Sequence, residues 1–159
     1  MATEINNNML MVMKECRNFW DVTTEDGQFS LSGGQIQLCG AYKVGQYILL
    51  TGSLLVDGLY QIIHKEDNSY TLDDAPIDEE WHGTVYGLRV PADFIRQCME
   101  IKMFRESEQG QPTIYDSETV LGVHSWSRGK TSTGEMLTWK HVFATGLTPY
   151  RRMFSNVRI

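Results

Sequence analysis

Short segments of alternating apolar and polar residues follow one another between Gly27 and Val90. Segments 27–31 and 35–38 alternate in this way, and Ser32-Gly33-Gly34 between them is typical of a tight hairpin turn. Further strands are expected over 45–53, 59–64, 70–72 and 82–90, with turns at 56–59 and 66–69. Strands this short, joined at hairpin distances, predict a compact antiparallel sheet or a small open barrel.

Helical spacing flanks this β region on both sides. Apolar residues recur at helical intervals from Met9 to Trp20, and Asn8 is the expected N-terminal cap. Pro91 suits the start of a second helix, which should end by Gly110 because glycine and proline follow there.

A third helix is expected over 135–144, stopped by Gly146. The fold class is therefore α+β: an N-terminal helix, a small antiparallel sheet or open barrel, and C-terminal helices preceded by a long irregular loop.

The chain has 159 residues, of which 42% are apolar and 21% charged, so it can bury the core of one domain. We predict a single domain over 1–159. Within it, the polar, glycine-containing stretch 111–134 is expected to form an extended loop or arm. Residues 145–159 are expected to form a C-terminal tail at an interface.

The composition argues against several classes of protein. The uncharged stretch 44–56 has 13 residues and is too short and polar to cross a bilayer. The N-terminus has neither the basic start nor the apolar run of a signal peptide, so export is not expected. Three widely spaced cysteines predict a reducing compartment rather than a disulfide framework. A net charge of −6 argues against a general nucleic-acid binder.

The net charge is unevenly distributed along the chain. Residues 1–88 hold four basic and 13 acidic residues, a net of −9, whereas residues 89–159 hold ten and seven, a net of +3. An acidic front and a basic tail favour head-to-tail contact between copies, or a tail that reaches an acidic partner. The alternative is that these charges only solvate two faces.

Known catalytic and cofactor motifs do not occur in the sequence. The four histidines are isolated, without the spacing of metal ligands, and Ser32-Gly33-Gly34 lacks the ending of a phosphate-binding loop. Neither a G-x-S-x-G elbow nor a cysteine in a catalytic context is present, and Cys16 and Cys98 are expected in the core. The sequence therefore predicts no enzyme, no metal and no cofactor.

Two groups of residues are candidates for binding partners. Aromatic and basic side chains are interleaved near the C-terminus, a mixture typical of protein interfaces and of nucleic-acid grooves; they are Trp126, Arg128, Lys130, Tyr150, Arg151, Arg152 and Phe154. We expect Trp139 and Phe143 only to dock their helix on the core. The second group is acidic and consists of Asp73, Asp74, Asp78, Glu79 and Glu80. A solvated surface loop is the alternative for this group.

Several blocks of the sequence resemble small neck proteins of tailed bacteriophages, the head-tail connector (adaptor or completion) proteins. The first block is Gly45-Gln46-Tyr47-Ile48, Gly52-Ser53 and Asp57-Gly58-Leu59-Tyr60. The others are the acidic loop leading to Trp81–Leu88 and Val90-Pro91, then Ser117-Glu118-Thr119 with Ser125-Trp126-Ser127-Arg128, and finally Trp139, Val142-Phe143 and Tyr150-Arg151-Arg152. Their order covers nearly the whole chain.

The resemblance implies a structural protein of the virion neck, made in the host cytoplasm. Its copies would form a ring that contacts the portal protein and a tail or stopper protein, without a membrane. The segment 111–134 and the C-terminal arginines would then contact a neighbouring subunit or the portal. Alternatively, Arg128 and Lys130 would line the channel and contact DNA non-specifically.

Two other functions stay open on the sequence alone. The first is a small β-barrel domain that binds single-stranded nucleic acid through its aromatic and basic residues. The second is a hydrolase whose catalytic residues meet only in the fold.

Overall fold

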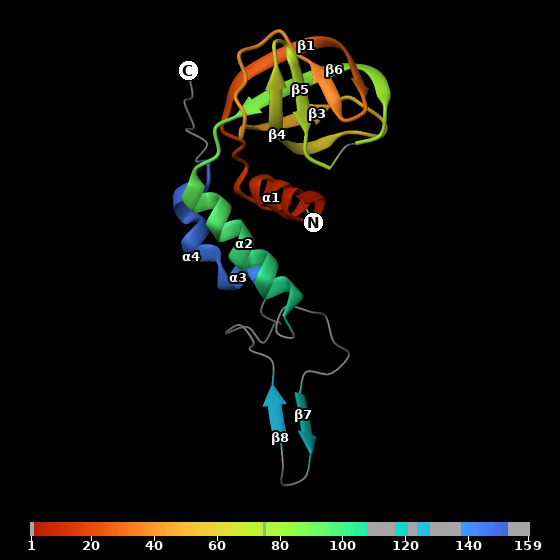
Figure 1. Cartoon of the computed structure of the whole chain (residues 1–159). Coiled ribbons are helices and arrows are strands. Elements are labelled where there is room, and N and C mark those ends of the chain that lie inside the picture. The colour runs from red at the N-terminus through yellow and green to blue at the C-terminus, as the bar shows by residue number, and fades with distance from the viewer. Residues whose placement is uncertain (1, 75, 108–116, 121–123, 128–137, 153–159) are drawn as a thin grey trace.

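Six antiparallel strands form a closed barrel in the computed structural model, which describes residues 2–74, 76–107, 117–120, 124–127 and 138–152. The strands are β1 (Asp21–Ser32), β2 (Gln35–Gln37), β3 (Tyr47–Thr51), β4 (Gly58–Glu66), β5 (Ser69–Leu72) and β6 (Glu79–Leu88). Their order around the barrel is β1-β2-β5-β4-β3-β6 (Figure 1). The α+β class and the small antiparallel β region are confirmed. The open barrel is corrected, because β1 pairs with β6 from Asp21–Leu88 to Leu31–Glu79 and closes the sheet.

Alternation along each strand places one set of side chains inside the barrel. The buried interior consists mainly of aliphatic and aromatic residues from every strand, among them Phe29, Leu31, Ile36, Ile48, Leu50, Ile62, Tyr70, Leu72, Trp81 and Val85. The predicted turn between β1 and β2 is confirmed. Gly33 and Gly34 both have positive φ, 58° and 76°, as the tightest hairpin turns require.

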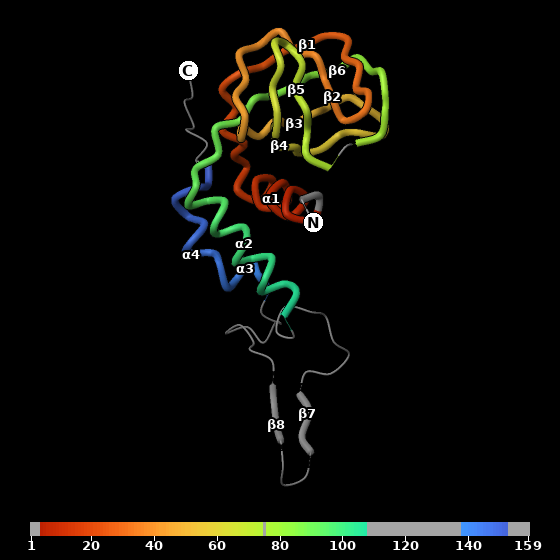
Figure 2. Tube along the Cα trace, viewed as in Figure 1, coloured from red at the N-terminus to blue at the C-terminus, as the bar shows by residue number. Residues whose placement is uncertain are grey.

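Helix α1 (Ala2–Cys16) lies against the outside of the barrel (Figure 2). Its buried Met9, Val12 and Met13 belong to a second core, which also contains Leu59 and Leu88 from the barrel wall. Half-buried Tyr47, Leu49 and Tyr86 from β3 and β6 pack against the same core. Helix α1 therefore covers the outer face of β3, β4 and β6.

The predicted bounds of the first helix were wrong at both ends. The helix begins well before Met9, and Asn8 is a buried residue in its middle instead of its cap. Asn8 Nδ2 donates to the Cys98 carbonyl at 2.7 Å. The side-chain amide of Asn8 is therefore buried, although the apolar periodicity placed this residue at the exposed start of the helix. The helix ends at Cys16, and Arg17 follows with a left-handed φ of 52°.

Helix α2 (Ala92–Glu106) packs on the other side of α1 through Phe94, Cys98 and Ile101. Pro91 precedes its first residue, close to the predicted start, and the helix ends within the predicted limit. Barrel, α1 and α2 thus form successive layers (Figure 1).

The C-terminal part contains β7 (Ser117–Val120), β8 (His124–Ser127), α3 (Trp139–Val142), α4 (Ala144–Leu147) and the 3₁₀ turn η1 (Thr148–Tyr150). Strands β7 and β8 form a hairpin inside the stretch that was predicted to be irregular. The prediction of a single helix over 135–144 was wrong for residues 138–144, the part of this range that the structure describes. Phe143, with φ −98° and ψ 7°, separates two four-residue helices, and α4 continues through Gly146.

Candidate functional site

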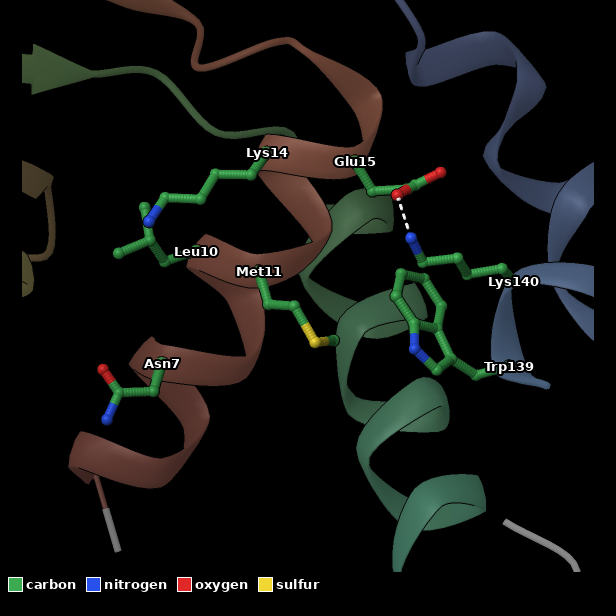
Figure 3. A pocket seen from close by; sticks show the side chains of 7 residues that line it. All are labelled: Asn7, Leu10, Met11, Lys14, Glu15, Trp139 and Lys140. Carbon is green, nitrogen blue, oxygen red and sulfur yellow. Dashed lines mark ion pairs between the residues drawn. The ribbon is translucent and has the colours of Figure 1, made fainter. Parts of the chain in front are cut away.

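A groove lies between α1 and the first turn of α3, with a cavity volume of about 630 Å³. Its lining, shown in Figure 3, consists of Asn7, Leu10, Met11, Lys14, Glu15, Trp139 and Lys140. The residues of α1 recur at three- and four-residue intervals and so line successive turns of one helix. We call this feature the α1–α3 groove.

The α1–α3 groove combines half-buried apolar surface with one lysine, Lys14, that is unpaired among the described residues. Leu10, Met11 and Trp139 supply the apolar surface. Lys140 pairs with Glu15 at 2.7 Å and thereby links α3 to α1, as the dashed line in Figure 3 marks. Lys14 is exposed and forms no ion pair with any residue that the structure describes. The groove therefore suits an apolar side chain that arrives with a negative charge.

Tyr150, one of the predicted interface residues, is an internal anchor of the C-terminal segment. Its ring packs against Phe94, at a centroid distance of 5.3 Å, and Trp20, at 6.3 Å, which contact each other at 4.5 Å. The Tyr150 carbonyl accepts a hydrogen bond from Asn18 Nδ2 at 3.0 Å. Tyr150 therefore fixes the chain against the end of α1.

Arg151 and Arg152 leave this anchor with exposed side chains. The Arg152 backbone N–H donates to the carbonyl of Cys16, the last residue of α1, at 3.1 Å. Cationic side chains at the carboxyl end of a helix are stabilised by its dipole. The two arginines thus lie on the surface, next to the end of α1.

Two more arginines, which sequence reasoning did not select, lie in the same region. Arg17 follows α1 directly, and the Arg89 backbone N–H donates to the Trp20 carbonyl at 2.9 Å. Both side chains are exposed. Only contacts between distant parts of the chain bring these residues together. We call Arg17, Arg89, Arg151 and Arg152 the basic corner.

The predicted acidic group does not form one site. Asp73 is buried and joins α1 to the barrel: Asn6 Nδ2 donates to its Oδ2 at 2.7 Å, and the Gln61 N–H donates to its Oδ1 at 2.6 Å. Asp73 is therefore removed from any exposed acidic surface. Asp74 and Glu80 are exposed.

Asp78 and Glu79 brace neighbouring loops of the barrel. Asp78 Oδ1 accepts a hydrogen bond from the Gly33 N–H at 2.7 Å and so holds the β1–β2 turn. Glu79 accepts hydrogen bonds from the Ser53 hydroxyl and from the backbone N–H groups of Leu54 and Leu55, each at 3.1 Å. The Ser53 hydroxyl, followed by these amides, holds the pKa of Glu79 below its ordinary value.

Three loops meet at one end of the barrel because neighbouring strands run in opposite directions. They are the β1–β2, β3–β4 and β5–β6 connections, and we call this region the loop end. It carries exposed aliphatic side chains: Leu54 is 95% exposed, Leu55 65% and Ile77 67%. Sequence reasoning missed them, although two adjacent leucines between Gly52 and Asp57-Gly58 are an unusual content for a turn.

Titratable groups with catalytic potential are scattered in the part of the chain that is described. No group of three or more His, Cys, Asp or Glu residues there could hold a metal ion. Burial raises the pKa of the Cys98 thiol to about 12 and also raises that of Cys16, so both stay protonated at neutral pH. Both are core residues, as predicted.

The remaining predicted interface residues fall outside what can be described. Arg128, Lys130 and Phe154 lie outside the described residues, and Trp126 is placed only as a position in β8. Among the helices that are described, none is long and apolar enough to cross a bilayer.

A comparison with protein-family models gave no match, and a search of curated proteins gave no significant one.

Proposed function

We propose that this chain is a structural protein of the neck of a tailed-phage virion, whose copies form a ring between the portal and the tail. The observation that carries the proposal is the contrast between two surfaces of one molecule. The loop end is acidic and bears exposed leucines, whereas the basic corner and the α1–α3 groove bear cations. Such a molecule favours heterologous contact, in which one face of each copy meets a different face of the next.

Two of the blocks that resemble neck proteins lie next to each other in the barrel. The Gly45 N–H donates to the Ile62 carbonyl at 2.7 Å, and the Ser53 N–H donates to Asp57 Oδ1 at 2.7 Å, so the first block shapes the β3–β4 hairpin. Strand β6, which contains the block Trp81–Leu88, pairs with β3 directly. These two blocks therefore belong to one connected unit of structure, which supports the proposal.

Nucleic-acid binding by the barrel is the weaker alternative. Base stacking needs exposed aromatic rings, but every aromatic side chain whose exposure the structure describes is buried or half-buried. Tyr47 and Tyr86, on the outer face of the barrel, pack against the core that α1 shares. A hydrolase remains the third choice, with no catalytic cluster to recommend it among the residues described.

Assembly of the purified chain tests the proposed function. Light scattering after size exclusion and negative-stain images should show rings, either of the chain alone or on addition of a portal protein. Portal and capsid genes directly upstream of the coding gene would agree with this result. A chain that stays monomeric at high concentration and with portal would contradict the proposal. Salt-sensitive binding to single-stranded oligonucleotides, measured by fluorescence anisotropy, would favour the first alternative instead.

A further inference from the structure

The β3–β4 loop presents its two leucines on a fixed backbone. The N–H groups of Leu54 and Leu55 each donate to Glu79, and the Leu55 N–H also donates to the Ser53 hydroxyl at 3.0 Å. Asp57 closes the loop by accepting the Ser53 N–H at 2.7 Å. Single exposed apolar residues are common on protein surfaces, but two adjacent ones on a braced loop lose little conformational entropy when they are bound.

The surroundings of Leu54 and Leu55 are entirely acidic in formal charge. Residues 44–64 and 66–88 contain no lysine or arginine, and the loop end carries exposed Asp57, Asp74, Asp78 and Glu80. A surface of this kind selects a partner with an apolar recess and positive charge nearby.

The α1–α3 groove of the same protein has both of these properties. Leu10, Met11 and Trp139 provide apolar surface that is only partly covered. Lys14 lies beside Leu10 (Figure 3) and has no acidic partner in the described part of the chain. Its volume of about 630 Å³ is within the range of about 300–1,000 Å³ that is typical of ligand pockets.

We propose that the Leu54–Leu55 loop of one copy docks into the α1–α3 groove of a second copy, with Lys14 facing the acidic loop end. The inference rests on the proposed ring-forming function and identifies the contact between subunits. Because the loop and the groove are different parts of the surface, a pair of bound copies still has one loop and one groove free, and the contact repeats from copy to copy.

A substitution of one exposed leucine tests the energetic role of the loop. Leu54→Asp should weaken self-association on the order of tenfold or more, because it removes buried apolar area and would bring a charged carboxylate into the apolar part of the α1–α3 groove. Val44→Asp is the matched control, since Val44 is a 59% exposed aliphatic residue in another loop. Sedimentation velocity over a concentration series measures both, and circular dichroism checks that both variants fold.

A cross-link between different copies tests the geometry. One protein carries Leu54→Cys and a second carries Asn7→Cys, each with Cys39→Ser, since Cys39 is the exposed native thiol and Cys16 and Cys98 are buried. A short bismaleimide should join the two proteins when they are mixed, whereas Val44→Cys should not join to Asn7→Cys. The mixed product can form only between copies, because each protein has one accessible cysteine.

The outcomes separate this contact from the proposed function. If the wild-type chain forms rings, while Leu54→Asp assembles normally or the mixed cross-link fails, the contact is wrong and the neck function stands. The same holds if Leu54→Asp abolishes only the binding of a portal protein. If the wild-type chain does not self-associate even with portal, both proposals fail.

Discussion

At the scale of single residues, Gly83 marks the tightest contact in the barrel wall. A Cβ built on Gly83 would lie 2.0 Å from the Thr51 carbonyl oxygen and 2.9 Å from the Trp81 ring, so the backbone would have to move. We expect Gly83→Ala to lower the free energy of unfolding by about 3 kcal/mol. Gly27 pairs with Gly83 across the ladder and has open space around its Cβ position, so Gly27→Ala should stay within about 0.5 kcal/mol of wild type. Urea denaturation compares the two, and equal losses would contradict the argument.

Glu79 makes the order of the β3–β4 loop dependent on pH. The folded state lowers the pKa of this carboxyl, so its bonds to the Leu54 and Leu55 amides stabilise the loop above the ordinary carboxyl pKa. That stabilisation is lost as pH falls through the lowered, folded-state pKa. We expect the protection factors of both amides to drop over this acidic range in hydrogen exchange. Glu79→Gln should lower them already at pH 7, whereas Glu80→Gln should not. Unchanged protection in Glu79→Gln would show that another group holds the loop.

At the scale of elements, Tyr150 decides whether the C-terminal segment stays on α1 and α2. Its ring packs against the contacting pair Trp20 and Phe94, while its hydroxyl has no hydrogen-bond partner among the described residues. We expect Tyr150→Ala to cost about 2–3 kcal/mol, since the half-buried ring leaves a cavity. Tyr150→Phe should cost less than about 0.5 kcal/mol because the ring contacts remain. Thermal and urea unfolding measure both, and an equal loss in the two variants would mean that the hydroxyl, and not the ring, matters.

The strands could be predicted from the sequence better than the helices, for a physical reason. Alternation and turn glycines such as Gly33 and Gly34 are local signals, and β2 to β6 overlap the strands expected for them. The bounds predicted for the first strand were wrong, because β1 begins at Asp21, six residues before Gly27. The closing pair β1–β6 joins residues 48 to 67 positions apart, from Leu31–Glu79 to Asp21–Leu88, which no local pattern reveals. The start of α1 was hidden because its buried face includes Asn6 and Asn8, which are paired with Asp73 and the Cys98 carbonyl. A hydrophobicity pattern assigns every polar side chain to the exposed face, so it cannot identify one that is buried with a hydrogen-bond partner.

At the scale of the whole molecule, the basic residues near the C-terminus are more fully available at the surface than the acidic run 73–80 is. The arginines at 151 and 152 are exposed as expected, but they gain Arg17 and Arg89 from the acidic half and its border. Part of the acidic run, in contrast, is engaged in internal hydrogen bonds, because Asp73 is buried and Asp78 accepts a hydrogen bond from the β1–β2 turn. Charge counted along the sequence therefore indicated that the molecule has regions of opposite charge. It could not show which carboxylates are already engaged in hydrogen bonds, since their partners lie up to 67 residues away.

The basic corner should contribute to assembly through charge and not through shape. Arg151 and Arg152 are exposed, and their anchoring is by backbone, so reversing their charge leaves the fold intact. We expect Arg151→Glu and Arg152→Glu each to slow association of copies, or of the chain with portal, several-fold at low salt. The difference from wild type should shrink as ionic strength rises and the Debye length falls below about 8 Å. Lys43→Glu, at an exposed lysine near the β2–β3 connection, is the control for net charge. Stopped-flow light scattering across a salt series measures the rates. If Lys43→Glu slows association as much as the arginine variants, the effect belongs to net charge alone, and the basic corner is not an interface.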